Sequence, residues 1–165
     1  MVLNDYETFI REILEKLNKL GIDVSDLNMD HIGYQASSDE DYDRLKTEFD
    51  KIGEKVAEEI VGGRRVGFYR LHSPLRFRQY TNTAIELFTP KEGQICPSAL
   101  EHVEFTLKES FESFMRRYPN VPWDTSVIGR PDFPMIKLEV DKNVQVKFHL
   151  TPVLEIIKPK REAKK

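Results

Sequence analysis

The chain has 165 residues, of which 39% are hydrophobic and 32% are charged, and its formal net charge is −3. This length favours one compact domain or two half-domains that share a core, and the slight acidic excess argues against a nucleic-acid surface. The sequence shows no signal peptide and no apolar run near the ~18 residues that cross a bilayer, and Cys96 is its one cysteine. We therefore expect a cytoplasmic protein that binds neither nucleic acid nor membrane.

The first half of the chain contains two patterns typical of helices. Apolar residues recur at helical spacing over residues 4–20, where Asn4 can cap the helix and Gly21 can stop it. Ser38 is a candidate cap for a second helix, which should end at Gly53.

Strands are expected before and after the second helix. The pair Gly62-Gly63 between two extended runs is a strong hairpin signal, and a looser loop is expected around Pro74. The predicted strands of this half are residues 29–35, 54–61, 64–71 and 83–88.

The second half repeats much of this order. A short helix over residues 111–118 should end before Pro119, the proline-rich residues 120–134 should form loops, and a helical turn is expected over residues 152–157. The predicted strands are residues 100–107, a weak strand at 126–128, and a hairpin of 135–140 and 144–150. An α+β sandwich without internal symmetry remains the alternative, because the halves share no recognisable sequence.

Alternation along the strand that opens the second half separates two faces. Glu101, Val103 and Phe105 share the face expected to pack against helices, whereas His102 and Glu104 point to the other face. The polar face of this strand is therefore where chemistry could occur.

Three further strands place ionisable side chains on the same side, namely His31, Glu86, and the pair Lys147 and His149. On a flat sheet these groups would form an ordinary solvated face. On a curved sheet they would converge in a cavity, where a divalent cation could balance their charge. The two imidazoles of His31 and His102 with the carboxylate of Glu86 suit Zn, Fe(II), Mn, Ni or Co.

Five blocks in this order carry a family resemblance: Asp30-His31-Ile32, residues 62–71, Ile85-Glu86-Leu87, residues 100–105, and Val146-Lys147-Phe148-His149. Together they make residues 10–157 similar to the YecM-like proteins of the vicinal-oxygen-chelate superfamily, which has glyoxalases and extradiol dioxygenases as members. The resemblance implies an α+β fold in which paired βαβββ modules form a curved, half-barrel mixed sheet, with helices on its outer face and an added N-terminal helix.

On this basis we expect a single domain over residues 1–165. Its parts would be an N-terminal helix (1–21), a first module (22–95), a second module (96–157) and a basic tail (158–165), which we expect to be disordered.

The resemblance also implies that His31, Glu86 and His102 bind a divalent metal ion. The fourth ligand position, usually a glutamate, is occupied by Lys147, and an ammonium group cannot bind a metal. Three outcomes follow: His149 becomes the fourth ligand, Lys147 admits an anionic substrate, or the site is incomplete.

The resulting expectation is a divalent-metal-binding protein, an isomerase or oxidoreductase that acts on a small molecule with neighbouring oxygens. Glu104 would be the catalytic base or an orienting residue, and Gln35 and Lys147 would contact the substrate. One alternative is a small-molecule binding module of the same fold that needs no metal. Another is a protein that docks a partner through its N-terminal helix or residues 76–80. A monomer and a homodimer are both compatible with the sequence.

Overall fold

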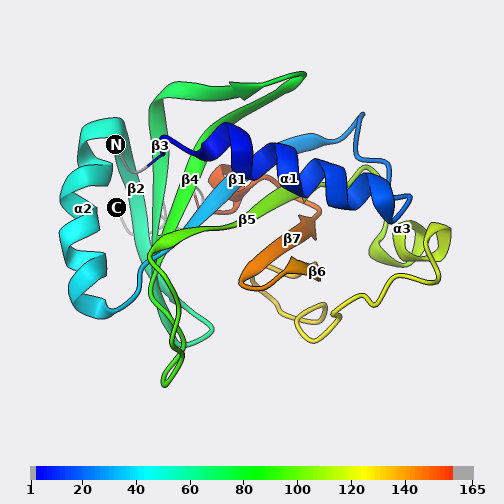
Figure 1. The fold of residues 1–165 in the computed structure, drawn as a ribbon. Coiled ribbons are helices and arrows are strands. Elements are labelled where there is room, and N and C mark those ends of the chain that lie inside the picture. Colours follow the sequence, from blue (N-terminus) through cyan, green and yellow to red (C-terminus); the bar gives the residue numbers. More distant parts are fainter. Residues whose placement is uncertain (1–2, 158–165) are drawn as a thin grey trace.

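The computed structural model describes residues 3–157, and the basic tail predicted at residues 158–165 lies outside them. Figure 1 shows the order of the elements along the chain, and a helical turn over residues 153–157 follows the last strand. The bounds of the elements are α1 (Tyr6–Lys19), β1 (Asn28–Gln35), α2 (Asp39–Ile52), β2 (Gly53–Val61), β3 (Arg64–Phe77), β4 (Tyr80–Phe88), β5 (Ala99–Thr106), α3 (Phe111–Arg117), β6 (Ile136–Asp141) and β7 (Val144–His149).

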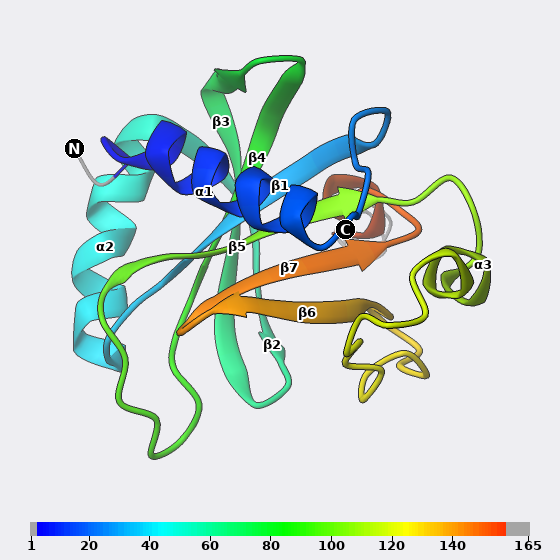
Figure 2. The same cartoon turned by 45° about the vertical axis from the view of Figure 1, so that its right-hand side comes forward.

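The strands form one mixed sheet in the order β2-β3-β4-β1-β5-β7-β6. The central strands β1 and β5 are antiparallel, and each is parallel to its outer neighbour, β4 or β7. The pattern of parallel and antiparallel neighbours is therefore the same on both sides of the β1–β5 pair. Figure 2 shows α2 and α3 at opposite ends of the sheet, with α1 between them. The α+β fold predicted from the sequence is confirmed.

Two apolar clusters lie on opposite faces of the sheet, as strand alternation requires. The larger cluster joins the helices to the sheet and includes Ile13, Phe49, Ile85, Val103, Phe105, Phe114, Val146 and Phe148. The smaller cluster lies on the other face and includes Val66, Phe68, Ala84, Phe88, Phe133, Val153 and Ile157. Burial of one large apolar side chain stabilises the folded state by about 1.5–3 kcal/mol. The strand face that carries the larger cluster is therefore the face that turns towards the helices. The other face is called the inner face below.

The two long helices begin in different ways. Ser38 caps α2 as predicted, since its hydroxyl accepts a hydrogen bond from the Asp41 amide at 3.0 Å. The cap predicted at Asn4 is wrong: α1 follows Asp5, which makes no side-chain cap bond. A backbone turn replaces the cap, because the carbonyl of buried Leu3 accepts from the Tyr6 amide at 3.2 Å.

The loop predicted around Pro74 is also wrong. β3 continues to Phe77 and pairs with the start of β4, so that the hairpin projects beyond the sheet (Figure 1). Proline is tolerated there because the register shifts between Arg70 and Leu75, where no regular ladder demands its missing amide hydrogen.

The weak strand predicted at residues 126–128 is absent, because these residues form a turn. The carboxylate of Asp124 accepts from the Ser126 amide at 2.9 Å, a local bond that favours turns over strands. An isolated bridge between Asp124 and Lys137 is the β-type pairing between this segment and β6. None of the helices among residues 3–157 has both the length and the apolar character that a membrane span requires.

Candidate functional site

Three neighbouring strands bring four ionisable side chains together on the inner face. β1 supplies His31, β4 supplies Glu86, and β5 supplies His102 and Glu104. The Nε2 atom of His31 lies 3.1 Å from Oε1 of Glu86 and 2.6 Å from Oε2 of Glu104. The Nε2 atom of His102 lies 3.3 Å from Oε2 of Glu86. One ligand atom from each residue lies within 4.8 Å of all the others, so the strands bring together the three ligands predicted from the sequence.

Gly33 makes room for one of the imidazoles. It lies opposite His102 in the β1–β5 register, and a Cβ atom at this position would lie 2.1 Å from Cε1 of that ring. Atoms cannot approach so closely without repulsion, so only glycine permits the observed position of His102.

Irregular strand register gives each histidine an adjacent acidic partner. The shifts between β1 and β5 leave Asp30 and Glu101 without a partner residue across the ladder. An extra residue of this kind redirects side chains relative to simple alternation. The Nδ1 atom of His31 lies 2.6 Å from Oδ2 of Asp30, and Nδ1 of His102 lies 3.0 Å from Oε1 of Glu101.

These two pairs favour one tautomer. When Nδ1 of a histidine donates its hydrogen to a carboxylate, the lone pair of Nε2 is available for a metal ion. Both Nε2 atoms point into the cluster, and the two rings are fully buried. The same arrangement therefore occurs on the first strand of each half of the sheet.

Three buried atoms of the cluster have no hydrogen-bond partner: Nε2 of His31, Nε2 of His102 and Oε1 of Glu104. Their neighbours are close but lie outside hydrogen-bond geometry. Buried polar atoms of this kind are costly unless something binds them. Two imidazole nitrogens and two carboxylates are a donor set that suits a divalent transition metal, so the residues present fit such an ion.

The pKa values of the cluster show that it favours positive charge. Burial, the largest influence, lowers the pKa of His31, but the carboxylates of Glu86 and Glu104 and the bond to Asp30 raise it well above its usual value. Burial raises the pKa of Glu104, but the charges of His149 and His31 outweigh this effect and bring it to about 2. The carboxylates are therefore ionised, and a proton or a metal cation can balance them.

The other predicted site residues lie in different surroundings. His149 belongs to a second group with Asp30 and Glu104, and its Nε2 atom lies 3.1 Å from Oγ1 of Thr106. Glu104, rather than His149, therefore lies in the four-residue cluster. Lys147 lines the cavity over this cluster, whereas Gln35 donates a hydrogen bond to Gln94 and is not among the cavity residues.

Sequence reasoning missed Asp30 and Glu101. Alternation assigned Glu101 to the face packed against the helices, but its carboxylate contacts His102. The signal that could have revealed both residues is the repeated pair of an acid directly before a strand histidine, Asp30-His31 and Glu101-His102. Asp30 has a further partner, because its Oδ2 atom accepts from the Val153 amide at 3.0 Å.

A small cavity of about 80 Å³ opens onto the cluster. Its wall contains Glu86 and Glu104, the stacked rings of Phe68 and Phe133, whose centroids are 5.8 Å apart, and several basic side chains. The cavity therefore joins the candidate metal ligands to a surface that can hold an organic molecule.

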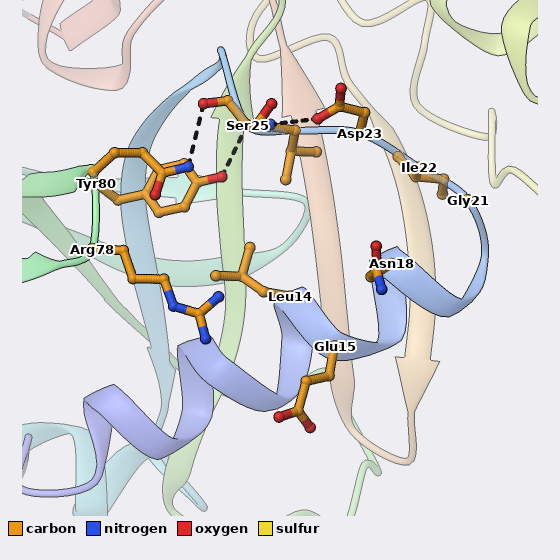
Figure 3. A pocket seen from close by; sticks show the side chains of 11 residues that line it. Leu14, Glu15, Asn18, Gly21, Ile22, Asp23, Ser25, Arg78 and Tyr80 are labelled. Carbon is orange, nitrogen blue, oxygen red and sulfur yellow. Dashed lines mark hydrogen bonds between the residues drawn. The ribbon is translucent and has the colours of Figure 1, made fainter.

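A larger cavity of about 350 Å³ lies elsewhere, between α1 and the β3–β4 hairpin (Figure 3). Two of its polar side chains bond to the backbone: the hydroxyl of Tyr80 donates to the Val24 carbonyl, and Gln79 donates to the Ser25 carbonyl. None of the unpartnered buried atoms among residues 3–157 belongs to its wall. Size alone therefore does not identify the reactive site.

Comparison with solved structures finds the same fold in methylmalonyl-CoA epimerases and in one structural-genomics protein. A methylmalonyl-CoA epimerase in complex with methylmalonyl-CoA and NH4+ is similar with a TM-score of 0.53 and 13% identity, covering 77% of this chain and 96% of the epimerase. A variant of the Streptomyces coelicolor methylmalonyl-CoA epimerase in complex with 2-nitronate-propionyl-CoA gives a TM-score of 0.53, 14% identity, and coverage of 78% and 97%. A structural-genomics protein, EC4020, is more similar, with a TM-score of 0.79, 23% identity, and coverage of 96% and 91%. At these identities the likeness concerns the fold.

The family described as YecM protein matches residues 1–149, and the chain belongs to this family. Protein YecM of Escherichia coli (strain K12) is 26% identical over 116 residues, which are 70% of this chain and 62% of that protein. A Haemophilus influenzae protein is 26% identical over 117 residues, which are 68% of this chain and 61% of that protein. The chain thus spans less than two thirds of the length of these curated relatives.

Proposed function

We propose that His31, Glu86, His102 and Glu104 bind one divalent metal ion, and that the protein acts on a small molecule with two neighbouring oxygens. The observation that carries this proposal is that the Nε2 atoms of His31 and His102 are buried and have no hydrogen-bond partner, although carboxylate oxygens of Glu86 and Glu104 lie close to them. The ion would lie between the two expected modules, residues 22–95 and 96–157. Its identity would be Zn, Fe(II), Mn, Ni or Co, as imidazole and carboxylate donors permit.

The chain's own residues would prepare the site in three ways. Asp30 and Glu101 hold the Nδ1 hydrogens of the two histidines, which keeps both Nε2 lone pairs available. Phe68 and Phe133 exclude water from one side of the cavity. Glu104 lines the cavity and its Oε1 atom has no hydrogen-bond partner, so this oxygen is the candidate acceptor for a substrate proton.

A bound divalent ion supplies Lewis acidity, which polarises an oxygen of the substrate. Proton transfer at Glu104 fits an isomerase, and an open ligand position fits an oxidoreductase. The epimerases of similar fold are described in complex with methylmalonyl-CoA and with 2-nitronate-propionyl-CoA. The cavity of about 80 Å³ here is well below the ~300 Å³ of an ordinary ligand pocket, so it suits a short molecule or the reacting end of a longer one.

Metal analysis of protein purified without chelator tests the proposal. We expect about one equivalent of transition metal in the wild type and a large loss in Glu86→Gln and His102→Gln, which remove a ligand but preserve side-chain volume. His72→Gln is the matched control, because His72 is exposed on β3. Protein that stays metal-free during titration with Co²⁺, Zn²⁺, Mn²⁺, Ni²⁺ and Fe²⁺ would overturn the proposal and favour the metal-independent binding module.

A further inference from the structure

The cavity over the cluster is strongly basic. Its wall contains the five cationic residues Arg64, Lys91, Arg130, Lys137 and Lys147. Of the described residues, the acidic ones in this wall are Glu86 and Glu104, and both are proposed metal ligands. The acids therefore belong to the floor of the cavity, and the cations form the rest of its charged wall.

Two of these cations come from opposite halves of the sheet and approach the same aromatic ring. The guanidinium carbon of Arg64 on β3 lies 5.0 Å from the ring centre of Phe88, and the Nζ atom of Lys147 on β7 lies 5.8 Å from it. Lys147 is only 8% exposed and lies beside Glu104 in the parallel β5–β7 register. Burial of this kind is unusual for a lysine unless its charge is balanced.

Within residues 3–157, neither Arg64 nor Lys147 forms an ion pair shorter than 4.0 Å. Lys137 on the same wall differs, because its Nζ atom lies 3.5 Å from a carboxylate oxygen of Asp124. The carboxylates that act on Arg64 over longer distances are those of Glu101 and Glu86, and Glu101 also acts on Lys147. Arg64 and Lys147 are thus two cations that face a cavity without a close counter-ion.

Metal binding would increase this imbalance. A divalent ion brings two positive charges, which offset Glu86 and Glu104 and leave Glu101 as the acidic group that acts on both Arg64 and Lys147. An incoming anion would restore the balance and would form charge-assisted hydrogen bonds with the guanidinium and ammonium groups. A neutral ligand would leave both cations desolvated and unpaired.

We propose that the ligand of this site is a short organic acid, a 2-hydroxy or 2-oxo carboxylate, whose negative charge is balanced by Arg64 and Lys147. This inference rests on the proposed metal site and adds the substrate class to it. An acid of this type carries neighbouring oxygens and a negative charge in a few atoms. The cavity of about 80 Å³ matches the liquid volume of roughly three water molecules, so it holds a compact group.

The test compares glycolate with glycolamide, which have the same neighbouring oxygens and differ in charge. Each is titrated into Co²⁺-loaded protein while the visible absorption of the Co²⁺ is followed. We expect glycolate to bind at least about tenfold more tightly than glycolamide, as one hydrogen bond to a charged group implies. Lys147→Met and Arg64→Met should each weaken glycolate binding by about tenfold and leave glycolamide binding unchanged.

Two controls separate the local effect from other causes. Lys142→Met removes the same charge from an exposed turn and should leave glycolate binding unchanged. Lys147→Arg keeps the charge and should retain most of the affinity that Lys147→Met loses. The Co²⁺ absorption of each variant shows directly whether the metal site has folded.

The results distinguish this inference from the proposed function. If the wild type binds no Co²⁺ or other divalent ion, the proposed function fails, and the inference fails with it. If Co²⁺ binds but glycolate and glycolamide bind equally, or if neither Lys147→Met nor Arg64→Met weakens glycolate binding, the inference alone is overturned.

Discussion

Substitution of Gly33 by alanine should disable the proposed metal site through a single added methyl group. The new Cβ atom would lie 2.1 Å from Cε1, 2.5 Å from Nδ1 and 2.6 Å from Nε2 of His102. To reach an ordinary contact of 3.4 Å, the ring must move by about 1.3 Å. Metal–ligand distances tolerate only about 0.2 Å, so this shift removes His102 from the ligand set.

The ring has little space in which to move. It contacts the ring of Phe88 at a centroid distance of 5.5 Å and that of His31 at 5.7 Å, and its Nδ1 atom is bonded to Glu101. We therefore expect Gly33→Ala to weaken Zn²⁺ or Co²⁺ binding by at least about 100-fold, the upper range for loss of support around a metal ligand. Overpacking should also destabilise the metal-free protein by about 1–3 kcal/mol.

Competition with a chelator measures the metal affinity, and urea unfolding of the metal-free protein measures its stability. Gly129→Ala is the matched control, because a Cβ atom at Gly129 meets no atom within 4 Å. A double-mutant cycle with His102→Ala isolates the contact: once the ring is removed, alanine at position 33 should cost much less. Wild-type metal affinity in Gly33→Ala would refute the reasoning.

Three further predictions concern the site and the helix caps. Glu101→Gln should weaken metal binding by about 10–100-fold and leave the fold intact, which a chelator competition with a circular dichroism control can check. Metal at about 100 times its dissociation constant should stabilise the fold by about 2.7 kcal/mol, and a chelator should reverse the accompanying rise in Tm. Ser38→Ala should lower the free energy of unfolding by about 1 kcal/mol, whereas Asn4→Ala should have little effect on urea unfolding.

Each of these expectations has an outcome that contradicts it. Unchanged metal affinity in Glu101→Gln would show that the contact to His102 does not support a ligand. A Tm that ignores both metal and chelator would argue against a site in the folded state. Equal destabilisation by Ser38→Ala and Asn4→Ala would contradict the different starts of α1 and α2.

The sequence predicted which strand faces meet in the site because the residues on the opposite faces are strongly apolar. Val103 and Phe105 pack against the helices, so His102 and Glu104 must point to the inner face. The same argument placed Glu86 correctly, since Ile85 and Leu87 belong to the packed face. Periodicity was sufficient wherever the ladder is regular.

Periodicity failed where the ladder is irregular. The register shift at Glu101 depends on how β5 pairs with β1, which no pattern within β5 reveals. The continuation of β3 past Pro74 depends in the same way on pairing with β4. His149 was predicted as the fourth ligand, but Glu104 lies in the four-residue cluster instead. This difference depends on the distances between strands, which side-chain alternation does not specify.

The hydrogen bond from the Val153 amide to Asp30 has a consequence for the order in which the protein is assembled. The two residues are separated by 123 positions, whereas each histidine directly follows its own acid along the chain. During synthesis, Asp30-His31 leaves the ribosome long before the turn at residues 153–157. Until that turn docks on the sheet, Asp30 lacks the donor that Val153 supplies, so the surroundings of His31 cannot be complete before the chain has been synthesised as far as this turn.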